Sequence, residues 1–142
     1  SLAGGTARPD WQGGAVALLP DAMRFARGNP AHAAVYVLDN ALDYLGRHDP
    51  AAVARHVQGL TTALLTRLEA AGIRSTTPHD PARHGASVCI AHPEAGRLSA
   101  ALHARGVWAW NGRGRVRFSF HGYNGMADVE RIVGALKGVG LG

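Results

Sequence analysis

The chain has 142 residues, of which 46% are hydrophobic and 18% are charged, and this composition is typical of one globular domain and excludes a disordered chain. No stretch approaches the roughly 18 consecutive apolar residues that a membrane helix needs, so no membrane partner is expected. The formal net charge of +5 comes from arginines spread along the chain, with Lys137 as the only lysine, and therefore predicts no nucleic-acid partner. The single cysteine, Cys89, allows no internal disulfide and fits a cytoplasmic protein.

The first part of the chain is predicted to be irregular. Residues 1–30 are rich in glycine and proline and show no lasting periodicity, which is typical of loop. A free-standing domain rarely begins with so long an irregular segment. We therefore interpret residues 1–30 as a remnant of a large-domain or dimer-contact segment and residues 31–142 as a C-terminal small domain.

Two helices are predicted next. From Ala31 onward, apolar residues recur at spacings of three and four on one face, namely at Val35, Leu38, Leu42 and Leu45. Asp49 can cap a second helix that has Pro50 at its first position. An apolar stripe continues along that helix to about Gly72, which is expected to end it.

The second half of the chain predicts a small sheet with two further helices. Tight-turn residues at 111–114 ("NGRG") indicate a hairpin. Strands are expected at Ile73–Thr76, 86–92, Val107–Trp110 and 115–121, and helices at about 94–105 and 125–138. The predicted fold class is α+β: two N-terminal helices followed by a small, mainly antiparallel sheet of three or four strands, covered on one face by helices.

The expected strand at 115–121 has two different faces. Side chains alternate along a strand, so Val116, Phe118 and Phe120 are predicted to point to the core. Arg115, Arg117, Ser119 and His121 then point the other way, because uncompensated cations are costly in a core. A guanidinium on a rigid strand can hold a carboxylate through two parallel hydrogen bonds. This face is therefore either plain solvent-exposed surface or the wall of a site.

Two segments carry a resemblance to a known family. "GRVRFSFHGYNGMADVERIVGAL" resembles the C-terminal signature of the class V aminotransferases, which are pyridoxal-phosphate enzymes of fold type I that include cysteine desulfurases, selenocysteine lyases and cysteine C–S lyases. Upstream, "RFARGNPAHAAVYVLDNALDYL" resembles a second segment of the same family. The likeness covers about residues 22–138. The residues that match the C-terminal signature are Arg117, Ser119, Tyr123, Asn124 and Asp128.

The resemblance implies roles for three residues. Arg117 would bind the α-carboxylate of an amino-acid substrate. His121 follows Arg117 on the same face of the expected strand and would either border that site or face solvent. Gly28 and Asn29 would contact the phosphate of pyridoxal 5'-phosphate held by the partner subunit of a homodimer. The implied partners are thus a missing large domain that binds the cofactor, a second copy of the enzyme, and a small amino acid or thioether as substrate.

Residues that are missing narrow the reaction. A pyridoxal-phosphate enzyme needs a lysine that bonds to the cofactor. Lys137 is better explained as a cation that suits the C-terminus of the last helix, so the chain is not expected to be catalytic alone. Cysteine desulfurases carry a nucleophilic cysteine in a loop just before the arginine strand, and this stretch has none. Cys89 is instead interpreted as a buried structural residue.

These observations leave two hypotheses of different classes. In the first, the chain is the C-terminal domain of a class V enzyme, and the favoured reaction is cleavage of the C–S bond of a cysteine-like amino acid. An epimerase-like enzyme and a kynureninase-like hydrolase are the alternatives within this class. In the second, it is a non-catalytic binding or dimerisation module within a biosynthetic multienzyme. No metal site is expected in either case, since the histidines show no metal-binding spacing. Without a large domain, Trp108, Trp110 and the apolar residues of the first helix should be exposed.

Overall fold

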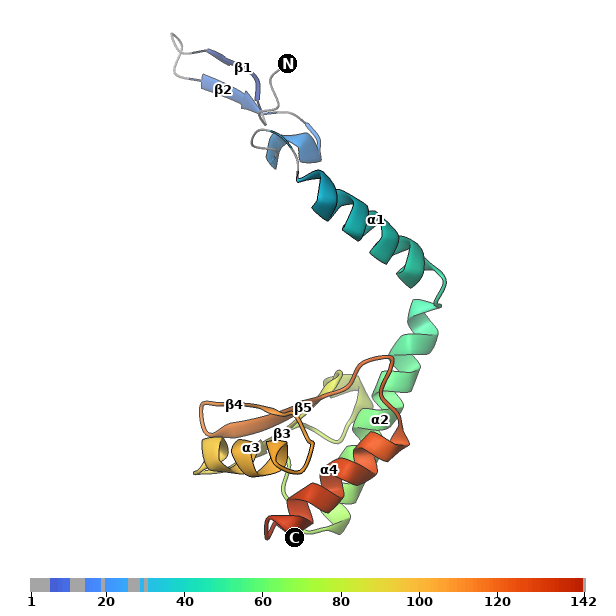
Figure 1. Ribbon diagram of the computed structural model, residues 1–142, viewed down its shortest axis with the longest axis vertical. Coiled ribbons are helices and arrows are strands. Elements are labelled where there is room, and N and C mark those ends of the chain that lie inside the picture. The colour runs from blue at the N-terminus through green and yellow to red at the C-terminus, as the bar shows by residue number, and fades with distance from the viewer. Residues whose placement is uncertain (1–5, 11–14, 19, 26–28, 30, 142) are drawn as a thin grey trace. The chain divides into compact units, whose positions relative to one another are not determined.

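The computed structural model describes residues 6–10, 15–18, 20–25, 29 and 31–141 (Figure 1). The chain divides into two compact units, Ser1–His48 and Asp49–Gly142. The prediction that residues 1–30 are a remnant and 31–142 a small domain concerns the complete protein, and this division does not test it. In the described part of the chain, no helix is long and apolar enough to cross a membrane.

The N-terminal unit holds more regular structure than its sequence predicted. Strands β1 (Thr6–Asp10) and β2 (Ala15–Leu18) pair antiparallel, with an irregularity in register between Thr6 and Pro9. A short 3-10 helix, η1 (Ala22–Phe25), follows. The prediction of loop throughout 1–30 is therefore wrong, because a short run of strand-compatible residues at 15–18 finds a backbone partner nearby in the sequence.

Helix α1 (His32–Gly46) confirms the first predicted helix. It has no side-chain cap at Ala31 and no buried residue. Within its own unit, the predicted apolar face is open: Val35 is 52% exposed, Leu42 58% and Leu45 61%. The helical spacing of the apolar residues thus predicted the helix correctly, although none of these residues is buried in a core.

Helix α2 (Pro50–Ala70) begins the C-terminal unit and confirms the second predicted helix. The Asp49 side chain accepts hydrogen bonds from the backbone N–H groups of Ala51 and Ala52, at 3.0 and 3.2 Å. These bonds satisfy donors that a helix start leaves free. Gly72 follows the helix with φ of +72°, a conformation that glycine adopts at little cost.

The sheet consists of β3 (Ser87–Ala91), β4 (Trp110–Gly112) and β5 (Arg115–Ser119), all antiparallel, in the order β3-β5-β4. A two-residue turn joins β4 to β5, and both of its residues have positive φ, 51° at Arg113 and 68° at Gly114. Such turns match the twist of the strands they join. The turn lies within the predicted turn residues 111–114, of which Asn111 and Gly112 belong to β4 instead.

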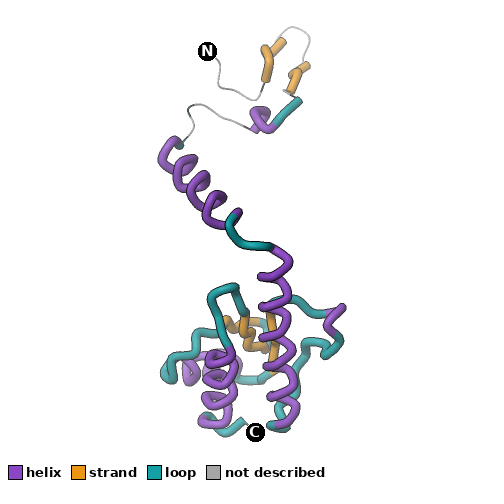
Figure 2. Tube along the Cα trace, turned by 90° about the vertical axis from the view of Figure 1, so that its right-hand side faces the viewer, coloured by secondary structure: helices purple, strands orange, loops and turns teal. Residues whose placement is uncertain are grey.

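Helices α3 (Ala95–His103) and α4 (Met126–Gly138) complete the unit, with the short 3-10 helix η2 (Pro81–Arg83) between α2 and β3. α3 packs on β4 and β5, while α2 packs on β3 and α4 (Figures 1 and 2). The core between the helices and the sheet includes Leu64, Leu68, Val88, Leu102, Val116, Phe118, Val129 and Leu136. The predicted α+β fold class, with one face of the sheet covered, is confirmed.

Two predicted strands are largely replaced by other contacts. Residues 107–109 are outside β4, because the Val107 N–H donates to the Leu102 carbonyl and the Ser99 hydroxyl donates to the Ala109 carbonyl at 2.9 Å. Their backbone is thus tied to the end of α3. In the segment Ile73–Thr76, only an isolated bridge between Ser75 and Ile90 has strand pairing.

Candidate functional site

The outer face of β5 carries the polar residues that the alternation predicted. Val116 and Phe118 are buried, at 0% and 2% exposure, whereas Arg115, Arg117 and Ser119 are exposed. The covering helices pack on the other face. Arg117 therefore lies on an open face at the middle of the central strand, where the backbone is fixed by pairing on both sides.

Arg117 lies in a row that crosses all three strands. It is directly opposite Cys89 on β3 and directly opposite Trp110 on β4. Residues directly opposite in an antiparallel pair point to the same face, so Cys89 shares the open face with Arg117. The interpretation of Cys89 as a buried core residue is therefore wrong: the residue is half-buried and faces away from the core. Alternation with Val88 and Ile90 was the signal that could have shown this.

The Arg117 guanidinium rests on an aromatic ring. Its central carbon lies 4.9 Å from the centroid of the Trp110 indole, within the range of a cation–π contact. Among the described residues, no aspartate or glutamate forms an ion pair with Arg117; the five ion pairs found there involve other residues. The guanidinium is thus oriented by a neutral group, and its charge is not cancelled by a local carboxylate.

Ser119, the next outward residue, is held from the neighbouring strand. Its hydroxyl lies 2.9 Å from the hydroxyl of Ser87, its directly opposite partner on β3. Cross-strand pairs of this kind stabilise a sheet locally. The pair fixes the register of β5 beside Arg117.

The loop after β5 is organised by Asn124. The Asn124 side-chain oxygen accepts a hydrogen bond from the His121 N–H at 2.8 Å, and its amide donates to the Asp128 carboxylate at 3.2 Å. Its backbone carbonyl lies 2.8 Å from Nε2 of His56 on α2. The His121 ring stacks on Tyr123, with centroids 5.5 Å apart. His121 is therefore exposed in a fixed loop beyond the end of β5, and its predicted place beside the substrate stays a prediction.

Asp128 lies in the first turn of α4, and the pKa of its carboxyl is lowered. The hydrogen bond from the Gly125 backbone N–H, 3.0 Å long, is the largest cause, followed by the Asn124 amide. Burial opposes the lowering of the pKa, and Arg131, 3.3 Å away, adds to it. The charged carboxylate thus ties the start of α4 to the loop that carries His121 and Tyr123.

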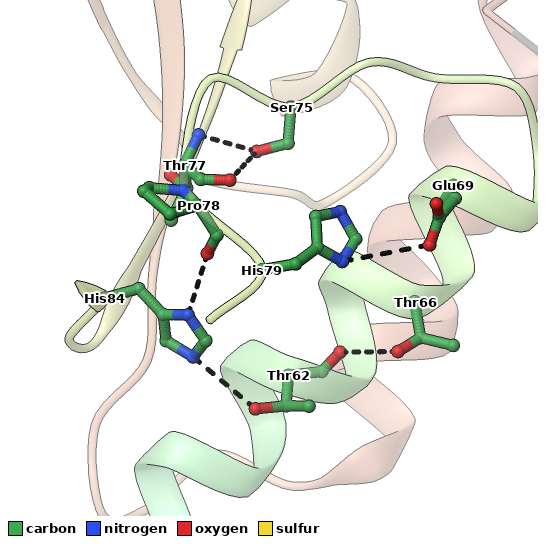
Figure 3. A network of polar contacts seen from close by, with 8 residues as sticks. All are labelled: Thr62, Thr66, Glu69, Ser75, Thr77, Pro78, His79 and His84. Atoms are coloured by element: carbon green, nitrogen blue, oxygen red, sulfur yellow. Dashed lines mark hydrogen bonds and ion pairs between the residues drawn. The ribbon is translucent and has the colours of Figure 1, made fainter. Parts of the chain in front are cut away.

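The other edge of the sheet is held by a network of polar contacts (Figure 3). The Thr77 hydroxyl accepts a hydrogen bond from the Cys89 N–H at 2.9 Å, and the Thr76 N–H donates to the Cys89 carbonyl at 2.8 Å. His84 connects this loop to α2: its Nδ1 lies 2.8 Å from the Pro78 carbonyl and its Nε2 lies 3.5 Å from the Thr62 hydroxyl. The backbone of Cys89 is therefore rigid.

A pocket of about 300 Å³ lies next to the end of β5. Its residues include Trp108 and Tyr123, which are 83% and 84% exposed, together with Ser119, while Arg117 is not among them. Its other lining residues include Phe118 and Phe120 of the covered face and Ile132 of α4, so the pocket lies beside the end of β5 on the side of α4 and does not include Arg117. Its aromatic rim can contact an apolar group.

Of the two predicted cofactor-binding residues, the structure describes only Asn29, and Gly28 lies outside the described residues. Asn29 is exposed, so its side-chain amide can donate a hydrogen bond to an anion. Lys137 is exposed in the last turn of α4. Because Lys137 is exposed rather than enclosed, it does not suit a bond to the cofactor, and the phosphate contact of Gly28 and Asn29 stays a prediction. Within the described ranges, no group of histidine, cysteine and acidic residues could hold a metal ion.

An α+β unit with helices on one face of its sheet, an arginine on the open face and the Tyr-Asn loop after it defines a C-terminal small domain of the class V, fold type I enzymes. Residues 53–136 match the family described as the kynureninase C-terminal domain. The chain belongs to this family, which confirms the predicted resemblance.

Solved structures show the same fold at low sequence identity. The apo structure of the cysteine desulfurase from Thermococcus onnurineus NA1 is 22% identical with a TM-score of 0.81, and the match covers 97% of this chain and 38% of that one. The cysteine desulfurase CsdA (S-sulfonic acid) from Escherichia coli is 21% identical with a TM-score of 0.75, over 96% and 37% of the two chains. The chain thus spans less than two fifths of these relatives. No curated protein matches it.

Proposed function

We propose that this chain is the C-terminal domain of a pyridoxal-phosphate-dependent class V enzyme that cleaves the C–S bond of a cysteine-like amino acid. The observation that carries the proposal is Arg117, held at the middle of the central strand on the open face and paired with no described carboxylate. Its role is to bind the substrate α-carboxylate through two parallel N–H···O bonds. Such an anchor fixes the orientation of the bonds at the α carbon.

The rest of the machinery belongs to the complete protein. Pyridoxal phosphate, when bound, supplies the electron sink for breaking bonds at the amino acid. This chain contributes Arg117, a border at His121, and a phosphate contact at Gly28 and Asn29 toward the cofactor of the partner subunit. The matched relatives are more than twice as long as this chain. We therefore propose a large domain that carries the cofactor lysine, in a cytoplasmic homodimer, with residues 1–30 as part of its contact segment.

The position of Cys89 favours a lyase over a persulfide mechanism. A cysteine that receives sulfur must reach the substrate and then move away from it. The Cys89 N–H and carbonyl are both held by the segment 75–77, and Cys89 lies on β3 directly across from Arg117. A rigid, half-buried thiol of this kind does not act as a mobile sulfur carrier.

The family match favours a second candidate reaction. The kynureninase C-terminal domain gives the family its description, and hydrolysis of a kynurenine-like amino acid would use Arg117 in the same way. The exposed aromatic residues Trp108 and Tyr123 at the neighbouring pocket suit a substrate with a large apolar group. Incubation of the complete enzyme with kynurenine and with S-methyl-L-cysteine, followed by product analysis, separates the two reactions.

The test is a binding comparison in the complete enzyme. We expect Arg117→Ala to weaken S-methyl-L-cysteine by about 2–5 kcal/mol, as for truncation of one partner of a desolvated ion pair, while cofactor absorbance stays in place. Arg97→Ala is the control, because Arg97 pairs with Glu94 on α3, away from the open face. Unchanged affinity in Arg117→Ala, or no binding by the parent enzyme, would sink the proposed function.

A further inference from the structure

Among the described residues, the indole of Trp110 is the aromatic ring that strand pairing places beside Arg117. Trp110 and Arg117 are directly opposite each other across β4 and β5, and the guanidinium carbon lies 4.9 Å from the ring centroid. Trp110 is 52% exposed, so its ring is covered only in part. The contact is therefore set by the register of the hairpin rather than by chance proximity on a surface.

Gly112 shows that the ring lies flat along its own strand. A Cβ atom placed on Gly112 would approach Cη2 and Cζ2 of Trp110 to 2.5 and 2.6 Å, which is closer than real Cβ atoms come. The ring thus occupies the space that a side chain at position 112 would fill. Glycine at this position allows the indole to lie across β4, where the side chain of the opposite arginine can rest on it.

We propose that Trp110 is a positioning residue that holds the Arg117 guanidinium ready for a substrate carboxylate; this inference rests on the proposed function of Arg117. An aromatic face attracts a cation through its quadrupole and offers neither a negative charge nor a lone pair to the guanidinium. A carboxylate, in contrast, is bound by two parallel charge-assisted N–H···O bonds. Support from Trp110 is therefore the weaker of the two interactions and leaves the charge of Arg117 available to the substrate.

A carboxylate could not replace the ring in this role. An aspartate or glutamate beside Arg117 would occupy its N–H fork and neutralise its charge, and a substrate would have to displace it. Trp110 restricts the side chain without competing for the ligand, so less side-chain entropy is lost when the carboxylate binds. We therefore expect an enzyme with Trp110 to bind the substrate carboxylate more tightly than one that lacks this ring.

The contact itself can be measured in the 142-residue chain. The Arg117 Nε–H signal in a nitrogen–proton NMR spectrum should carry a ring-current shift that disappears in Trp110→Leu and persists in Trp108→Leu, a matched loss of an exposed tryptophan. Gly112→Ala should also change the shift, because it forces the ring to move while leaving the strand backbone in place. An Arg117 signal that is the same in all four proteins would overturn the inference.

The consequence for binding is measured in the complete enzyme. Trp110→Leu should raise the dissociation constant for S-methyl-L-cysteine about 3- to 30-fold, with Trp110→Phe recovering most of the loss and the control Arg97→Ala near the parent value. The carboxamide analogue of the same amino acid should bind equally to parent and Trp110→Leu. In an Arg117→Ala background, Trp110→Leu should have no further effect.

The outcomes separate the two claims. If Arg117→Ala weakens the amino acid and Trp110→Leu does not, the positioning role is wrong and the proposed function stands. If Arg117→Ala has no effect, the proposed function itself fails. If Trp110→Leu weakens the acid and the carboxamide alike, the ring acts as a general contact surface and the positioning role is overturned.

Discussion

Asp128 shows how one residue supports the site from outside it. Its carboxylate accepts from the Gly125 N–H and from the Asn124 amide, so the start of α4 and the loop after β5 share one acceptor. Loss of such a capping interaction costs about 1 kcal/mol of stability. Arg117 lies two residues before Ser119, whose pair with Ser87 precedes this loop. The loop therefore affects the surroundings of Arg117 only indirectly.

The lowered pKa of Asp128 predicts how stability depends on pH. The ordinary value is near 3.8, and the folded value lies below it. Because the unfolded chain binds the proton first, the stability that Asp128 contributes is fully present above the ordinary value and is lost as the pH falls through the folded one. Urea unfolding should therefore show the parent more stable than Asp128→Asn at pH 6 and the difference shrinking below about pH 4. A constant difference down to pH 2 would contradict the assigned cause.

Helix α2 is the element on which the C-terminal unit is built. Leu64 and Leu68 are fully buried and face the sheet and α4. The first turn of the same helix, in contrast, is exposed around Val53. One helix thus offers both a deeply buried site and a matched surface site.

This contrast gives a prediction about core packing. Leu64→Ala should destabilise the chain by about 2–5 kcal/mol, because the lost side chain leaves a cavity that the core fills only in part. Val53→Ala on the same helix, at a site that is 39% exposed, should change the free energy of unfolding by less than about 0.5 kcal/mol. Chemical denaturation monitored by circular dichroism measures both. Equal effects would mean that the described core does not carry the stability.

Periodicity predicted the regular elements and missed the contacts made across them. The helices and the alternation in β5 follow from local patterns, so α1, α2, α3, α4 and the Arg117 face could be read directly. Residues 107–109 also alternate, but the Ser99 and His103 side chains take up the Ala109 backbone, and no local pattern contains that competition. The pairing of Trp110 with Arg117 depends on the exact length of the turn, and the turn predicted at 111–114 is longer than the observed one at Arg113 and Gly114.

At the scale of the whole molecule, the buried hydrophobic residues belong to one unit. In the described part of the chain they run from Leu60 to Leu136, all within Asp49–Gly142. The expected exposure of Trp108, Trp110 and the valines and leucines of α1 is also observed, each at 52% or more. The described core thus lies entirely in Asp49–Gly142, whereas α1 has exposed apolar side chains and no buried residue.

Residues 49–142 should therefore fold without the segment before them. We expect this shorter chain to unfold cooperatively, with a thermal midpoint within a few degrees of the full chain, since the core and the Asp49 cap are both retained. The full chain should bind more of a dye that reports exposed apolar surface, because it adds the face of α1. Calorimetry and dye fluorescence check the two statements, and a shorter chain that fails to fold would refute the first.

The turn at Arg113 and Gly114 also determines when the arginine acquires its aromatic support. Trp110 and Arg117 are seven positions apart, whereas Cys89 and Arg117 are 28 apart. Closing so short a loop costs little chain entropy, and hairpins form within about 1–10 μs. The pair can therefore meet repeatedly in the unfolded ensemble without any contact to β3. The contact between Trp110 and Arg117 depends only on residues close in the sequence, whereas the pairing of β5 with β3 needs a much longer loop to close.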